Sequence, residues 1–257
     1  PVFTVTSDTG HRITVTDNHP FLTVEGWTEL RALMPGDHIA VPRSLKETGG
    51  HTPMECHQLI VLAALISEGN ACHPSGVYIY NNSAAYIDDV VHSARQFADT
   101  HPTISQRRGR YEVYLGTGVQ TTFAKGDAPW NKGLSGYPRS GSHGRFATVP
   151  RSGVRQWIEE LGLAWVKSTE KFIPEPVFQL PNDQLALFLG RLWTGDGHVW
   201  SASNPGSLFY ATSSQRLAIE VQHLLLRLSF VAVLKHKRFR YRGTMRPGYA
   251  VYLFGAE

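Results

Sequence analysis

The fold of this chain is decided by two stretches that read almost as copies of each other, Val61-Leu-Ala-Ala-Leu-Ile-Ser-Glu68-Gly69 and Leu189-Gly-Arg-Leu-Trp-Thr-Gly-Asp196-Gly197. Each is an apolar run at helical spacing that ends in a single carboxylate followed by glycine. The runs predict helices over residues 55–67 and 183–194, with the small residues Ala63 and Gly190 near their middles, where two backbones can approach closely. Two such helices packed side by side would bring Glu68 and Asp196 together, and paired carboxylates can hold a divalent metal against a phosphodiester.

The glycine after each carboxylate is expected to end its helix. Gly69 and Gly197 can take the left-handed conformation that commonly terminates helices. A carboxylate followed by glycine is a frequent helix ending, so one copy would mean little. Two copies after matching apolar runs favour an enzymatic site over a purely structural pattern.

Strand patterns follow each predicted helix, with a further helical pattern between them, so each half reads as αββαβ and the chain has a weak internal repeat. The expected strands cover residues 77–80 and 111–115 in the first half, and 208–211, 231–235 and 249–254 in the second; the expected helices cover 87–98 and 215–228. The stretch of about 116–155 between the halves is basic and rich in Gly, Pro and Ser. It is either a flexible linker or an arm that follows DNA.

The distribution of charge is more informative than its total. The 257 residues carry a net charge of +4, with 42% hydrophobic and 18% charged residues, which describes an ordinary globular protein of one large domain or two small ones. Two acid-poor stretches, from His101 to Arg155 and after Glu220, combine basic and aromatic residues. This favours a nucleic-acid partner, although a solvated basic face has the same composition. The candidate DNA-binding residues are Arg107, Arg108, Arg110, Tyr111, Lys237, Arg238, Arg240 and Arg242.

The composition also predicts where the protein works. Cys56 and Cys72 are the only cysteines, which is too few for a secreted disulfide framework. No apolar run approaches the ~20 residues that cross a bilayer, and the chain begins directly in a strand pattern instead of a signal peptide. We expect a cytoplasmic protein without a membrane partner.

The first fifty residues predict a small all-β segment with tight turns. Residues 2–6 and 13–16 alternate apolar and hydroxyl side chains around Ser7-Asp-Thr-Gly10, which is typical of a hairpin whose glycine has a positive φ. The string Gly10-His-Arg-Ile-Thr-Val-Thr16-Asp-Asn-His19-Pro-Phe-Leu22, with Gly26-Trp27 and Leu33-Met-Pro-Gly36-Asp37 after it, resembles the threonine–histidine block of inteins. Inteins are self-splicing proteins with the Hint fold, and the order of this string is similar to inteins of bacterial replicative helicases.

The intein resemblance implies roles for two residues. Thr16 and His19 match the positions that orient and protonate the peptide bond before the intein's first residue. Imidazole suits this chemistry near neutral pH. The host's flanking exteins would be partners in the full-length precursor. The chain has no nucleophilic first residue and no final His-Asn, so we expect residues 1–50 to be part of a Hint segment that cannot splice alone.

Most of residues 55–257 resembles the single-chain, two-repeat LAGLIDADG homing endonucleases, a domain commonly inserted in inteins. The most specific parts are Phe188-Leu-Gly-Arg-Leu-Trp-Thr-Gly-Asp-Gly-His-Val199 and Tyr210-Ala-Thr-Ser-Ser-Gln-Arg-Leu-Ala218. The resemblance implies an α+β endonuclease domain over residues 51–257 that acts as a monomer. Its saddle-shaped sheets would read a long asymmetric site in double-stranded DNA through the major groove.

The same resemblance implies a mechanism, the metal-dependent double-strand cleavage of the intein-less host allele. Mg²⁺ would be held by Glu68 and Asp196, and a central lysine would tune the attacking water. Lys235 is the first candidate for this lysine and Lys237 the second. The first motif is the looser one, because Glu68 replaces the commoner aspartate and Ala63 the commoner glycine.

Two alternative hypotheses keep the same fold. In the first, the domain is a degenerate endonuclease that binds DNA without cutting it, and in the second it is an RNA maturase. The intein-like first fifty residues argue against the maturase, which has no use for a Hint segment. The ATPase activity of a helicase host has no support in this sequence, since no Gly-Lys-Ser/Thr phosphate loop occurs in it.

Overall fold

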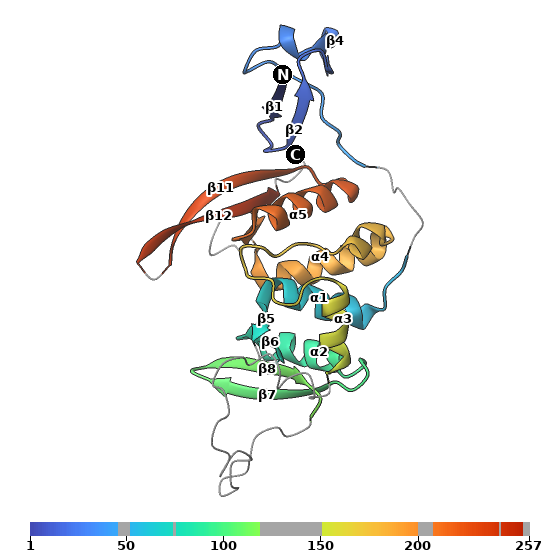
Figure 1. Ribbon diagram of the computed structural model, residues 1–257, viewed down its shortest axis with the longest axis vertical. Helices are drawn as coiled ribbons and strands as arrows, with labels where there is room; N and C mark the ends of the chain where they lie inside the picture. Colours follow the sequence, from blue (N-terminus) through green and yellow to red (C-terminus); the bar gives the residue numbers. More distant parts are fainter. Residues whose placement is uncertain (46–51, 74–75, 119–150, 200–207, 242, 254–257) are drawn as a thin grey trace, which may run out of the picture. The chain divides into compact units, whose positions relative to one another are not determined.

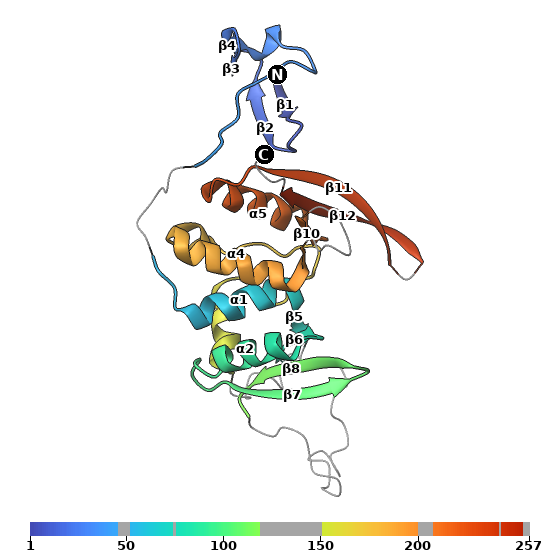
Figure 2. The same cartoon turned by 180° about the vertical axis from the view of Figure 1, so that it is seen from behind.

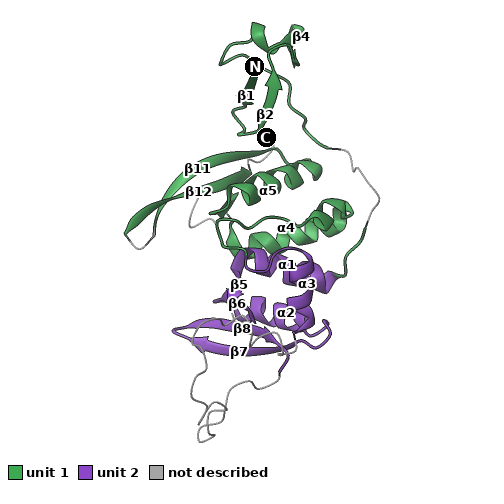
Figure 3. Ribbon diagram, in the orientation of Figure 1, with its two compact units in different colours: residues 1–55, 166–257 green, residues 56–165 purple. Residues whose placement is uncertain are grey.

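The computed structural model describes residues 1–45, 52–73, 76–118, 151–199, 208–241 and 243–253. It divides into two compact units, residues 1–55 with 166–257 (unit 1) and residues 56–165 (unit 2), coloured separately in Figure 3. The predicted domain boundary near residue 50, the candidate residue Arg242 and most of the predicted 116–155 connection lie outside the described residues.

Unit 2 holds the first half of the internal repeat (Figure 1). Its elements are α1 (Cys56–Glu68), β5 (Gly69–His73), β6 (Gly76–Asn81), α2 (Ala84–Ala94), β7 (His101–Arg107), β8 (Arg110–Gly116) and α3 (Gly153–Glu160). The four strands form an antiparallel sheet in the order β5-β6-β8-β7. Helices α1 and α2 pack against each other and against this sheet. The core of the unit consists of fully buried side chains that include Leu59, Leu62, Ile66, Ile79 and Ile87.

Unit 1 holds the second half of the repeat together with the N-terminal segment. Its second half contains the 3₁₀ helix η3 (Glu175–Gln179), α4 (Asn182–Asp196), β9 (Gly197–His198), β10 (Leu208–Thr212), α5 (Gln215–Arg227), β11 (Ala232–Tyr241) and β12 (Thr244–Leu253). The sheet order β9-β10-β12-β11 is that of unit 2. Helix α5 packs on β10, β11 and β12, and the long β11–β12 hairpin continues beyond it, as Figures 1 and 2 show.

The predicted α+β class and the internal repeat are confirmed, with a difference in the number of strands. Each half reads αββαββ, which is one strand more than the predicted αββαβ pattern, and β5, β7 and β9 lie where no strand range was expected. The segments 69–73 and 197–198 are short, and each begins with glycine, which has a low β-propensity. They become strands through pairing with β6 and β10, which is a tertiary effect that a local pattern does not contain.

The N-terminal segment forms two separate hairpins instead of one closed sheet. Strand β1 (Val2–Thr6) pairs with β2 (Arg12–Thr16), and β3 (Pro20–Thr23) pairs with β4 (Gly26–Glu29), which leads into the 3₁₀ helix η1 (Leu30–Ala32). No residue between 1 and 45 is buried, and Val24, Trp27 and Met34 are 92%, 73% and 74% exposed. Two-stranded hairpins are marginally stable alone, so this segment depends on contacts with other parts of its unit.

Among the described residues, no helix is both long and apolar enough to cross a lipid bilayer.

Candidate functional site

The two predicted carboxylates occupy equivalent places in the two halves. Glu68 is the last residue of α1 and Asp196 the last residue of α4, and in each case the next residue, a glycine, begins the first strand of the sheet. Glu68 belongs to unit 2 and Asp196 to unit 1. Their predicted convergence therefore stays a prediction, while their equivalence within the repeat is a structural fact.

The prediction that these glycines are left-handed is wrong. Gly197 is extended, with φ −87° and ψ 155°, and Gly69 is not among the residues with positive φ. The reason for glycine is steric: a Cβ atom at Gly69 would lie 2.5 Å from Cα of Leu65, and one at Gly197 would lie 2.4 Å from the carbonyl oxygen of Trp193. The chain passes from helix to strand within one residue, so it runs against the last helical turn. Glycine thereby fixes where each carboxylate emerges.

Glu68 is held by two donors from its own sheet. Its Oε1 accepts a hydrogen bond from Asn81 Nδ2 at 3.3 Å, and its Oε2 lies 3.4 Å from Nη2 of Arg110. The guanidinium of Arg110 also stacks over the ring of Tyr80, 5.1 Å from its centroid. The Glu68 side chain remains 22% exposed. A carboxylate that is oriented, charged and still open to solvent is suited to binding a cation.

The sheet that follows Asp196 in unit 1 has an aromatic and basic face. The Nζ atoms of Lys235 and Lys237 lie 5.2 Å and 4.9 Å from the ring centroid of Tyr252, and Lys237 also lies 5.0 Å from that of Phe209. Both lysines are exposed. Contacts between ammonium groups and aromatic faces orient the lysines without neutralising them, so they present positive charge along the strand.

The open faces of the two sheets correspond residue by residue. In unit 2, Tyr78 pairs with Tyr114 across the strands, and in unit 1 Phe209 pairs with Tyr252 at the equivalent position; their ring centroids are 5.1 Å and 5.3 Å apart. Register places Ser105 of β7 where β11 has Lys235, and Arg107 where it has Lys237. These aromatic pairs were not predicted from the sequence, although the alternation of Tyr78 and Tyr80 along β6 indicates an aromatic strand face.

The charges on the two faces differ. In unit 2 the face contains Glu112 as well as Arg110, and burial, followed by the charge of Glu112, raises the pKa of Tyr80. Burial also raises the pKa of Tyr114, so both phenols stay protonated near neutral pH. In unit 1 the corresponding positions of Glu112 and Arg110 are Ala250 and Gly248. The second half therefore presents the more cationic face.

The predicted DNA-binding residues separate by the alternation of side chains along each strand. Lys235 and Lys237 share the open face, whereas Arg238 and Arg240 point to the opposite side of β11. In unit 2, Arg107 pairs with Arg110 at the end of the β7–β8 hairpin, while Tyr111 shares the side of the buried Val113. Arg108 lies in the turn with φ 53°. One flat surface cannot engage all of these residues.

Thr16 and His19 of the intein-like block lie on one turn between β2 and β3. The amide of His19 donates to the carbonyl of Thr16 at 3.2 Å, and the Thr16 hydroxyl donates to Asn18 Oδ1 at 2.6 Å. The His19 ring is half-buried against the edge of Phe21, with centroids 5.2 Å apart. The structure thus places the pair together, and their predicted role in splicing stays a prediction.

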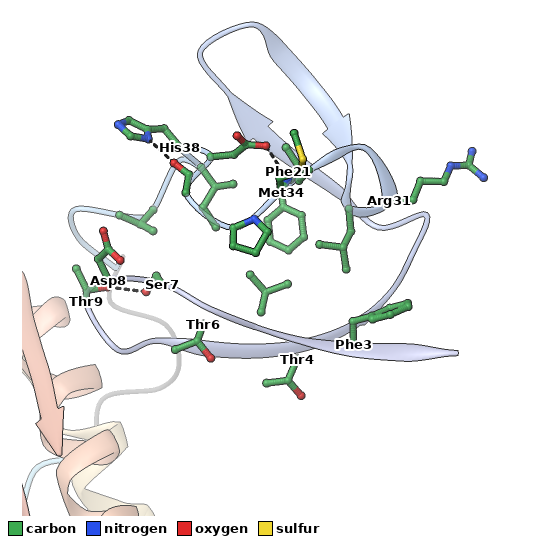
Figure 4. Close-up of a pocket in the computed structure, with 18 of the residues that line it drawn as sticks. Phe3, Thr4, Thr6, Ser7, Asp8, Thr9, Phe21, Arg31, Met34 and His38 are labelled. Carbon is green, nitrogen blue, oxygen red and sulfur yellow. Dashed lines mark hydrogen bonds between the residues drawn. The ribbon is translucent and has the colours of Figure 1, made fainter.

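A groove with a cavity volume of about 860 Å³ lies beside this block (Figure 4). Strand β1 forms one wall through Phe3, Thr4 and Val5, and Phe21 and Met34 face it from the other wall. Thr16 and His19 are not among the residues that line it. The groove is therefore the uncovered apolar interior of the two hairpins.

The donor set of the two carboxylates fits a hard divalent cation in kind, because carboxylate oxygens are the ligands that Mg²⁺ prefers. Among the residues that the structure describes, no group of three or more His, Cys, Asp or Glu side chains could enclose a metal. Any such ion would therefore keep water or substrate oxygens in its coordination sphere.

Comparison with known proteins supports this description. Residues 183–257, which contain all but the first residue of α4 and the whole second sheet, match the model of the "LAGLIDADG-like domain" family. These residues form a LAGLIDADG-like domain. The resemblance predicted from Phe188–Val199 and Tyr210–Ala218 is thereby confirmed. The first half of the repeat has the same strand order as the LAGLIDADG-like domain.

The chain is also similar to segments of larger proteins. It is 32% identical over 260 residues to the replicative DNA helicase DnaB of Synechocystis sp., which covers 99% of this chain and 26% of the helicase. It is 25% identical over 255 residues to a DNA gyrase subunit of Mycobacterium gordonae, which covers 93% of this chain and 39% of the gyrase subunit. The chain spans about a quarter of the length of the DnaB relatives, in agreement with the resemblance to inteins of replicative helicases.

Among solved structures, a variant of I-DmoI in complex with its target DNA and in the presence of Mn has a TM-score of 0.45 and 10% sequence identity; the alignment covers 77% of this chain and 87% of that one. A likeness at this level assigns no residue roles.

Proposed function

We propose that this chain is the endonuclease part of an intein and makes a metal-dependent double-strand cut in the uninterrupted host gene. One observation carries the proposal: Glu68 and Asp196 end equivalent helices, and each is followed by a sheet with the same strand order. A twofold repeat with one carboxylate in each half suits a substrate that has two strands to cut.

The relatives support an inserted module instead of the host's own activity. A helicase and a gyrase subunit share with this chain a stretch that covers nearly all of it but only 26% and 39% of themselves. Since the helicase and the gyrase subunit are different host proteins, we infer that the activity of the shared segment is independent of either host. The helicase's own activity is not proposed for this chain.

Different residues of this chain have different proposed roles in metal binding and DNA binding. Glu68 and Asp196 would hold the metal, which when bound activates water and offsets charge on the departing oxygen. Arg110 and Asn81 orient Glu68 through the contacts at 3.4 Å and 3.3 Å. Lys235 is the candidate for tuning the water, and Lys237 beside it would bind backbone phosphate. Arg107 and Arg110 provide the matching charge in the first half.

The test is cleavage of a plasmid that carries the uninterrupted host gene, with Mg²⁺, by the wild type, Asp196→Asn and Asp183→Asn. Asp183 is an exposed aspartate in the first turn of the same helix, so it is a matched control. We expect one double-strand cut, lost in Asp196→Asn and kept in Asp183→Asn, while DNA affinity remains in both.

Other outcomes discriminate the alternatives. A specific gel shift without a cut would indicate a degenerate DNA-binding domain, and binding to host RNA alone would indicate a maturase. Loss of binding in Asp196→Asn would contradict the metal role, because removal of a metal ligand should affect the chemical step more than the contacts with the DNA backbone.

A further inference from the structure

Arg110 contacts the candidate metal ligand of the first half through its guanidinium. Its Nη2 lies 3.4 Å from Oε2 of Glu68, and the side chains of Arg110 and Glu68 are 53% and 22% exposed. This distance is longer than the about 2.7–2.9 Å of a strong charge-assisted hydrogen bond. Water competes for both groups, so the pair is weak. Arg110 therefore offsets part of the charge of Glu68 and can leave it at little cost in free energy.

The other neighbours of Arg110 keep its side chain near Glu68 without binding it tightly. The guanidinium lies over the ring of Tyr80, 5.1 Å from the centroid, and a contact of this kind orients the charge without neutralising it. Glu112, two residues along β8, is on the same side of the sheet. The cross-strand partner of Arg110 on β7 is Arg107, and like charges in such a pair repel each other. Arg107 therefore favours the departure of Arg110 to a stronger anion.

Asn81 holds the other oxygen of Glu68 independently of Arg110. Oδ1 of Asn81 accepts the backbone amide of Ser83 at 2.8 Å, which fixes the orientation of the side-chain amide. Its Nδ2 donates to Glu68 Oε1 at 3.3 Å. Since each carboxylate oxygen has more than one lone pair, this bond leaves room for a cation. If Arg110 leaves, Glu68 stays oriented and regains its full negative charge.

The second half has a glycine at the position of Arg110. The registers of the two sheets place Gly248 of β12 where β8 has Arg110. Gly248 has no side chain, and a Cβ atom there would lie only 2.9 Å from Cδ1 of Phe239. The second half, which carries Asp196, therefore cannot make an arginine contact from this position. Control by an arginine at this register is specific to Glu68.

The two interactions of Arg110 oppose each other. A divalent cation and a guanidinium compete for Oε2 of Glu68, because both are positive and repel each other at this range. Arg110 therefore has to move away before Glu68 can hold a cation. A phosphate of the DNA backbone offers Arg110 a bidentate, charge-assisted partner, which is stronger than the single contact at 3.4 Å.

We propose that Arg110 gates cation binding at Glu68: it pairs with the carboxylate in the free protein and passes to a backbone phosphate when DNA binds. Glu68 thereby becomes available to a cation only together with the substrate. Arg110 is a positioning residue, since it acts through Glu68. The gate rests on the proposed function, because it requires Glu68 as a metal ligand and DNA as the substrate.

A titration of the DNA-free protein with Mn²⁺, followed by the EPR signal of the free ion, tests the gate. Arg110→Met removes the charge and keeps the aliphatic stem, and we expect it to raise the Mn²⁺ affinity by about two- to fivefold, the strength of an exposed ion pair. Loss of a merely structural residue would lower the affinity. Arg110→Lys should retain most of the low wild-type affinity. Arg151→Met is the matched control, because Arg151 is 55% exposed and pairs with Glu159; it should leave the affinity unchanged.

Glu68→Gln separates a failure of the gate from a failure of the proposed function. Combined with Arg110→Met, it should remove the gain in Mn²⁺ affinity. If Glu68→Gln weakens Mn²⁺ binding but Arg110→Met leaves the affinity of the free protein unchanged, the gate is overturned and the metal role of Glu68 stands. If Glu68→Gln has no effect on Mn²⁺ binding with or without DNA, the proposed function fails and the gate fails with it.

DNA binding in EDTA tests the transfer of Arg110 to phosphate without any metal. Glu68→Gln should strengthen binding to a duplex of the uninterrupted host gene, because Arg110 no longer pairs with the carboxylate. In the Arg110→Met background the gain should be smaller, since only the general loss of one negative charge remains. Arg110→Met alone should lower the slope of log affinity against log salt by about one phosphate contact. Equal gains in the two backgrounds, or an unchanged slope, would overturn the transfer.

Discussion

Replacement of Gly197 by alanine should destabilise the second half of the repeat and displace Asp196. The backbone of Gly197, with φ −87° and ψ 155°, is one that alanine adopts readily, so the effect is purely steric. The new Cβ would lie 2.2 Å from Cδ1 of Trp193 and 2.4 Å from its carbonyl oxygen. The indole cannot simply swing away, because it packs against Tyr210 with ring centroids 5.6 Å apart and its Nε1 is buried.

The loss of stability in Gly197→Ala depends on how far the carbonyl group and the indole of Trp193 can move away from the new Cβ. Overpacking a fixed site costs typically 1–3 kcal/mol, and a backbone carbonyl has no rotamer with which to relieve the clash. We therefore expect a loss of about 3 kcal/mol. At roughly 2–4 °C per kcal/mol for a chain of this size, the melting temperature should fall by roughly 6–12 °C.

Urea unfolding followed by circular dichroism measures the loss, with Gly190→Ala as the control on the same helix. Gly190 is exposed, and within unit 1 nothing lies within 4 Å of an added Cβ. That variant should gain up to about 1 kcal/mol from helix propensity. If Gly197→Ala loses less than about 1 kcal/mol in its free energy of unfolding, the explanation that glycine is needed there to avoid a clash with the last helical turn is refuted. Destabilisation by Gly190→Ala would instead support the close helix approach that the sequence predicts there.

Three further changes have expected outcomes. Ser214→Ala should lower the free energy of unfolding in urea by about 2 kcal/mol, and Ser83→Ala should lower it by about 1 kcal/mol. Both serines cap equivalent helices, but the fully buried Ser214 also donates to Lys171 O at 2.6 Å. Equal losses in the two variants would contradict this difference. Arg227→Met should cost about 3 kcal/mol or more, since Arg227 is buried and its guanidinium donates to Phe178 O, Leu180 O and Asn182 Oδ1. A neutral effect in the same assay would show that these hydrogen bonds are dispensable. Lys237→Ala should reduce the salt dependence of DNA binding, measured by fluorescence anisotropy, by about one phosphate contact. This reduction should be larger than that of Arg238→Ala, because Arg238 lies on the opposite side of β11. The reverse order would place the DNA on the other face of the strand.

The two helices that carry the carboxylates were predictable because their apolar spacing is strong and local. The expected helices 55–67 and 183–194 are α1 (Cys56–Glu68) and α4 (Asn182–Asp196), whose ends lie within one or two residues of the predicted ones. The positive φ of Gly10 was also expected, since a two-stranded hairpin with a tight turn demands it. Equivalent carboxylates at the helix ends follow directly from the repeat.

Features that depend on pairing between distant segments were not predictable. Strand β11 runs to Tyr241, well beyond the expected end at residue 235, because its charged residues pair along their whole length with β12. A polar stretch of this kind reads locally as a turn. The contacts of Thr9 with Leu234 and Gln222 connect residues more than two hundred positions apart, and no local pattern indicates them. The same is true of Asn81 and Arg110 beside Glu68.

The central claim is that Glu68 and Asp196 serve one metal-dependent site on DNA. A titration of the protein–DNA complex with Mn²⁺, followed by the EPR signal of the free ion, measures this most directly. The account predicts that Glu68→Gln and Asp196→Asn each weaken Mn²⁺ binding, while Asp183→Asn does not. Binding that is unchanged in either of the two site variants would contradict a site formed by both carboxylates.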